Sequence, residues 1–229
     1  MGLRFEVLGA NTGRQPDRIG QPGADMVSED MMTAFHEAGH AIARIEIEAA
    51  RPDLIAPEPL LLVSIISDAA RHGYAAMPAR ITSIDDVRDI DELIDYRARL
   101  KARVGFSKSK LYQTVEADII EILAGQVAEE VAEKNRCLED EDIEEFALHC
   151  AGDGWLFEND IDDITRIQKR MALLQYDYVK SSKIVVHTIS LLRCDTDFGR
   201  TKICEIAKIL MSRKIMSGDD FREIWRKIS

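Results

Sequence analysis

The stretch "MTAFHEAGHAIARIE" (residues 32–46) places His36 and His40 four positions apart in a run of good helix formers, with Glu37 directly after the first. Residues four apart lie one above the other on a helix, so both imidazoles can face one ion. Glu37 can then reach a water on that ion without being a ligand. This is the HExxH geometry of zinc hydrolases, in which zinc lowers the pKa of its water to about 7 and the glutamate accepts the proton.

The residues that flank the histidine pair are small or apolar, as in "AGHAIA" (residues 38–43), which indicates a buried helix. Two histidines on a surface helix are the alternative interpretation. Buried imidazoles need polar partners, however, and a metal ion supplies one. The stretch therefore predicts a zinc site.

The pattern along the rest of the chain predicts a mainly α fold with one small β-hairpin near the histidine helix. The helix should begin after Ser28, a good N-cap, and end near Ala50 because prolines follow. "LLLVSIIS" and "HGYAAMPA" are typical of the two hairpin strands. Further helices are expected at residues 117–133, from about 159, at 183–193 and at 200–212.

We interpret residues 1–229 as a single domain. Residues 1–27 would be a lead-in of strand and loop, and residues 135–157 an acidic insertion that contains "LEDEDIEEFALHC". A composition with 46% hydrophobic and 31% charged residues is typical of a globular protein and argues against disorder.

Catalytic zinc takes three protein ligands and leaves a fourth position open, so a third ligand is needed. Asp160 is the predicted one, because a carboxylate aimed into a core is costly unless it is paired or binds a metal. It shares a helical stripe with four apolar residues: Ile164, Ile167, Met171 and Leu174. Asp162 and Asp163 share their stripes with arginine and lysine, so we interpret them as solvent-facing acids in ion pairs.

Glu129 is a candidate to hold a ligand imidazole by its other nitrogen. It lies four residues after Gly125, where a missing side chain lets another helix come close. The alternative is that Glu129 lies at the rim and Gly125 is only a packing notch. His72, His149 and His187 are weaker candidates, and an exposed or helix-edge position is favoured for each.

Composition and charge exclude several classes of protein. The longest apolar run is too short to span a membrane, and the start lacks a secretory signal. A net charge of -11 argues against binding nucleic acid through a broad basic face. The spacing of Cys137, Cys150, Cys194 and Cys204 fits neither a disulfide framework nor a CxxC metal site. We therefore expect reduced thiols and a cytoplasmic protein.

The sequence resembles the peptidase domain of the FtsH family of membrane-anchored AAA proteases. The matching pieces are "FHEAGHAIA", "VSIISDAARHGYAAMP", "ILAGQVAEEV", the "NDI" of residues 159–161 and "AKILMSRKIMSGDDFREI". This resemblance implies a mostly helical zinc peptidase in which His36, His40 and Asp160 hold the metal and Glu37 is the base. It also implies that Glu129 supports the site.

By the same resemblance, the strand at Gly73, Tyr74 and Ala75 is the edge to which an extended peptide or unfolded protein substrate adds. The chain departs from the family in lacking a GxxxxGK[ST] phosphate loop and a membrane helix, so we expect ATP-independent hydrolysis within this chain. The alternative function is a metal-binding adaptor that keeps the peptidase fold without proteolysis. A homo-oligomer or a separate partner protein is compatible with either function.

Overall fold

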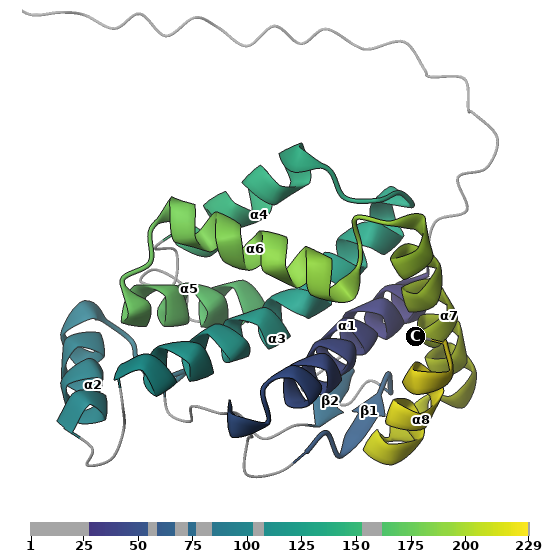
Figure 1. Cartoon of the computed structure of the whole chain (residues 1–229), viewed down its shortest axis with the longest axis horizontal. Coiled ribbons are helices and arrows are strands. Elements are labelled where there is room, and N and C mark those ends of the chain that lie inside the picture. Colours follow the sequence, from purple (N-terminus) through teal and green to yellow (C-terminus); the bar gives the residue numbers. More distant parts are fainter. Residues whose placement is uncertain are drawn as a thin grey trace, which may run out of the picture.

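The structure of the protein is a computed structural model, which describes residues 28–54, 59–66, 73–76, 84–102, 108–152 and 162–228 (Figure 1). The helices are α1 (Glu29–Ala50), α2 (Ile90–Ala102), α3 (Lys108–Lys134), α4 (Asp140–Ala151), α5 (Asp163–Leu174), α6 (Tyr178–Leu192), α7 (Asp197–Arg213) and α8 (Gly218–Ile228). Three short strands, β1 (Leu62–Ser64), β2 (Tyr74–Ala76) and β3 (Ile215–Ser217), form one sheet. The predicted mainly α fold with a small sheet is confirmed. The predicted lead-in at 1–27 lies outside the described residues.

Helix α1 carries the histidine pair and forms at the predicted place. Its N-cap is Ser28, whose side chain accepts a hydrogen bond from the Met31 amide. A short 3-10 helix, η1 (Pro52–Leu54), follows its end. Helix α1 lies between α3 on one side and α7 on the other, so its apolar residues are buried almost all round (Figure 1).

Helices α1 and α3 approach each other closely at Gly39. A Cβ added at that glycine would lie 2.2 Å from the carbonyl oxygen of Ala124. The small residues around the histidines therefore do more than make α1 a buried helix. They also let its backbone pack closely against α3. This close approach sets the distance between the α1 histidines and the side chains of α3.

The other helices pack on two sides of the central pair, α1 and α3. Helices α5 and α6 pack on α3, and α4 packs on α6, whereas α7 and α8 lie on the far side of α1 (Figure 1). Helix α4 occupies most of the predicted acidic insertion. Its buried Asp142 accepts hydrogen bonds from Lys134 and Arg136, which tie the start of α4 to the end of α3.

The sheet has the order β2-β1-β3, with both pairings antiparallel. The hairpin of β1 and β2 agrees with the sequence, and Val63 pairs with Ala75 at its centre. Strand β3 was not predicted, because three residues between two helices carry no strand pattern. It pairs with β1 on the side opposite to β2, so β2 lies at one edge of the sheet.

Two helices begin elsewhere than the sequence indicates. Helix α5 begins at Asp163 rather than near 159, and residues 153–161 lie outside the described part of the chain. Helix α6 begins at Tyr178, with Asp177 as its N-cap, rather than at 183. Within the described ranges, the helices are too short or too polar to cross a lipid bilayer.

The contact at Gly39 makes a stability prediction. Alanine at an exposed helix position would add about 1 kcal/mol of helix propensity over glycine. Here the added methyl meets a backbone carbonyl, and overpacking typically costs about 1–3 kcal/mol or more. We therefore expect Gly39→Ala to lower the free energy of unfolding by about 2 kcal/mol in urea denaturation. A gain in stability would contradict the close approach of α1 and α3.

Candidate metal centre

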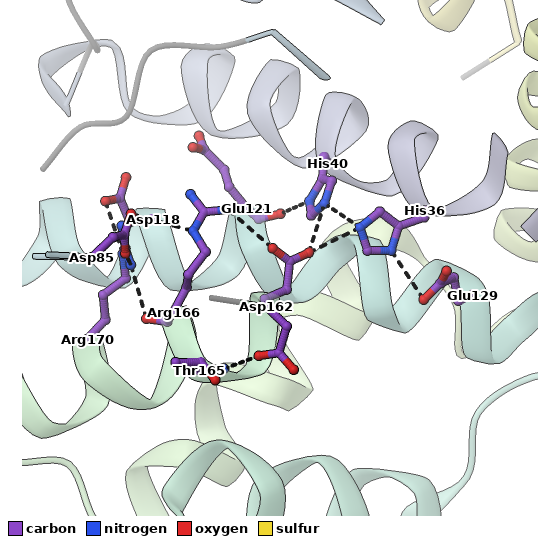
Figure 2. A network of polar contacts seen from close by, with 11 residues as sticks. His36, His40, Asp85, Asp118, Glu121, Glu129, Asp162, Thr165, Arg166 and Arg170 are labelled. Atoms are coloured by element: carbon purple, nitrogen blue, oxygen red, sulfur yellow. Dashed lines mark hydrogen bonds and ion pairs between the residues drawn. The ribbon is translucent and has the colours of Figure 1, made fainter. Parts of the chain in front are cut away.

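Three possible metal ligands converge where α1, α3 and the start of α5 meet (Figure 2). The Nε2 atoms of His36 and His40 are 2.9 Å apart. Oδ2 of Asp163 lies 3.1 Å from the first of these nitrogens and 3.3 Å from the second. Two imidazole nitrogens and one carboxylate oxygen thus form a nearly equilateral triangle.

The triangle has the size of one face of a zinc coordination tetrahedron. Nitrogen and oxygen ligands lie about 2.0–2.1 Å from zinc, which at tetrahedral angles puts them about 3.3 Å from one another. The donor set, two histidines and one carboxylate, is also one that catalytic zinc uses. The residues therefore fit a zinc ion with three protein ligands.

The second nitrogen of each histidine has an acceptor on α3. His40 Nδ1 lies 2.7 Å from the backbone carbonyl oxygen of Glu121. Because a carbonyl only accepts, this nitrogen carries a proton and Nε2 keeps a lone pair for a metal. His36 Nδ1 lies 3.2 Å from Oε2 of Glu129, in an ion-pair contact. Glu129 thus lies where the sequence suggested.

Gly125 forms the floor under both rings. A Cβ at this position would lie 2.6 Å from Nε2 of His40 and 3.0 Å from Cε1 of His36. Glu121, Gly125 and Glu129 are four residues apart and form one stripe of α3. This stripe therefore contacts both rings and fixes their orientation.

The structure brings a different aspartate to the histidines than the one that the sequence predicted. Asp163, which was predicted to face solvent, has a side chain only 15% exposed and points at both histidines, so that interpretation is wrong. The predicted ligand, Asp160, lies outside the described residues. Asp162 is the exposed N-cap of α5 and accepts a hydrogen bond from the Thr165 amide.

The reason for the difference is where α5 begins. The predicted stripe counts helical phase from a helix that begins near residue 159, whereas α5 has its N-cap at Asp162. Asp163 is four and seven residues before Ile167 and Arg170, both fully buried. Arg170 is one of the basic residues whose stripe was interpreted as solvent-facing, but its side chain is buried. Asp163 lies on the same stripe of α5 and therefore also faces inward.

Glu37 is the buried acid beside the triangle. The residue is 5% exposed, and its Oε2 has no hydrogen-bond partner among the described residues. Gly73, just before β2, lies against it, since a Cβ there would be 3.2 Å from Cγ of Glu37. Ala75 in β2 makes a backbone hydrogen bond to the same carboxylate. For Tyr74, the structure describes only the backbone.

Burial and charge shift the pKa values of these groups. Burial raises the pKa of Glu37, although the two histidines oppose that shift. Burial also disfavours a charged His36, but the carboxylates of Asp163 and Glu129 outweigh it and raise the pKa of His36 to about 10. Burial acts to raise the pKa of Asp163, and the two imidazoles hold it well below its usual range. These shifts favour a charged His36 beside an ionised Asp163, at a contact of 3.1 Å.

Neither a protein-family model nor a curated protein matches the chain. The arrangement combines three converging donors, two oriented imidazoles and a buried carboxylate with one oxygen that has no partner within the described part of the chain. It can hold a divalent ion and place a base next to a water on that ion. His72 lies outside the described residues, and His149 and His187 are exposed.

Variants of three neighbouring aspartates test which one binds the metal. We expect Asp163→Asn to weaken zinc binding by at least about 100-fold, since loss of a ligand should cost no less than loss of an outer partner. Asp162→Asn is the control, because asparagine keeps the N-cap and removes one charge. Competition with a chromogenic chelator measures each affinity. If Asp160→Asn weakened zinc binding and Asp163→Asn did not, the third ligand would be Asp160 instead.

Proposed function

We propose that the protein is a zinc metallopeptidase that hydrolyses peptides or unfolded protein segments without ATP. His36, His40 and Asp163 would hold the zinc ion, and Glu37 would be the general base. The free cysteines favour a cytoplasmic location. The HEAGH resemblance to the FtsH family supports the same activity.

The observation that carries this proposal is the state of Glu37. A buried carboxylate oxygen without a partner is costly, so a carboxylate kept in this state usually has a role in chemistry. Glu37 lies between the two histidines in the sequence of α1. Its Oε2 has no hydrogen-bond partner among the described residues. A structural zinc site or a binding module has no need of such a base.

When bound, zinc would supply a water of lowered pKa and would polarise the carbonyl of the scissile bond. Glu37, whose pKa burial raises, would accept a proton from the attacking water and deliver it to the leaving amine. Glu129 and the Glu121 carbonyl keep the rings in place.

Strand β2 is where we propose that the substrate binds. Within the described ranges, β2 pairs with β1 alone, so its other edge can accept an extended peptide by main-chain hydrogen bonds. The Ala75 amide on this strand also holds Glu37. A peptide added along Gly73 to Ala75 would therefore pass directly over the base.

Glu37→Gln tests the proposed chemistry. The amide keeps the shape of the side chain but cannot accept the proton, so we expect cleavage of casein to fall by roughly 10²–10⁴-fold. Zinc stoichiometry should remain that of the wild type. Glu29→Gln, an exposed position on the same helix, is the matched control and should cleave normally.

Equal cleavage by the wild type and Glu37→Gln would contradict the role of this residue. Zinc binding with no cleavage by the wild type would favour the adaptor alternative.

A further inference from the structure

Arg166 contacts the oxygen of Asp163 that does not face the histidines. Its Nη1 donates a hydrogen bond to Oδ1 at 3.2 Å, whereas Oδ2 is the oxygen near both imidazoles. Arg166 lies one turn after Asp163 on α5 and is about one-third exposed. The two oxygens of this carboxylate therefore have separate partners.

A second acid holds Arg166 from the other side. Oδ2 of Asp85, in the turn before α2, lies 3.6 Å from Nε of Arg166. The other oxygen of Asp85 accepts a 2.7 Å hydrogen bond from Nη1 of the fully buried Arg170. Arg170 in turn contacts Asp118 of α3 at 3.3 Å, so a chain of charges runs from α3 to the metal centre (Figure 2).

Each arginine of this chain has an acid to offset it. Arg166 and Arg170 carry two positive charges, which Asp85 and Asp118 offset. Lys169 also contacts the turn before α2, because its Nζ donates a 2.7 Å hydrogen bond to the backbone carbonyl of Asp85. An arginine beside a metal ligand would by itself repel a cation, and the adjacent carboxylate of Asp85 reduces that repulsion. The chain can thus orient Asp163 with little loss of metal affinity.

We propose that Arg166 is a positioning residue that keeps Asp163 a one-oxygen ligand. The inference rests on the proposed metal site. With Oδ1 held by Arg166, only Oδ2 is offered to the ion, and the fourth position stays open for water. Without Arg166, the carboxylate can rotate, bind through both oxygens or turn away. Partners of ligands typically contribute about 10–100-fold in metal affinity.

The test compares Arg166→Gln, Arg166→Lys and Asp85→Asn with the wild type. Arg200→Gln is the matched control, because Arg200 also pairs with an aspartate three residues earlier and is similarly exposed, but lies far along the chain on α7. Zinc affinity is measured by chelator competition, and the visible spectrum of the Co²⁺-substituted protein reports the coordination number. Thermal unfolding without metal reports any general loss of stability.

We expect Arg166→Gln to weaken zinc binding by about 10–100-fold and to change the Co²⁺ spectrum. Arg166→Lys should recover part of the affinity, since it keeps the charge without the planar fork. Asp85→Asn should weaken binding too, because it leaves the arginine charges uncompensated. If Arg166→Gln does not fold, Arg166→Lys and Asp85→Asn decide the question.

Wild-type affinity and an unchanged spectrum in the Arg166 and Asp85 variants would overturn the inference while leaving the metal site intact. A loss of stability in Arg166→Gln without a change in zinc affinity would likewise reduce Arg166 to a structural role. A wild type that binds neither zinc nor Co²⁺ would instead refute the metal site itself, and with it this inference.

Discussion

The close approach of α1 and α3 is the constraint on which the site depends. Gly39 of α1 lies against the Ala124 carbonyl, and Gly125 of α3 lies directly under the imidazoles. A side chain at either glycine would push the helices apart or displace a ring. With both glycines in place, the Glu121 carbonyl oxygen lies 2.7 Å from Nδ1 of His40. Backbone packing therefore orients the histidines, before any ion binds.

Buried charges join the two helices of this pair to each other and α3 to its neighbours. Arg44, one turn after His40, is fully buried and contacts the Glu121 carboxylate at 3.1 Å. Arg170 has the same role between Asp118 and Asp85. Removing one partner of such a pair typically costs about 3–5 kcal/mol, because a charge is left buried without compensation. The site thus lies in a region where each charged group constrains its neighbours.

The histidine helix, its Ser28 cap and the hairpin could be predicted, because caps, spacing and apolar pattern are local signals. The position of Glu129 followed from its spacing to Gly125. Asp163 could not be identified by the same logic, since Arg170, of a residue type that normally faces solvent, is internal in α5, and its charge hid the inward stripe. Strand β3 depends on pairing with β1, about 150 residues earlier, which no local pattern reveals.

The most direct measurement is anomalous X-ray diffraction at the zinc edge from crystals of the purified protein. The account predicts one ion bound by Nε2 of His36, Nε2 of His40 and Oδ2 of Asp163, with a water in the fourth position within hydrogen-bond distance of Glu37. A fully occupied site with four protein ligands, or a histidine pair that holds no metal in zinc-supplemented crystals, would contradict it.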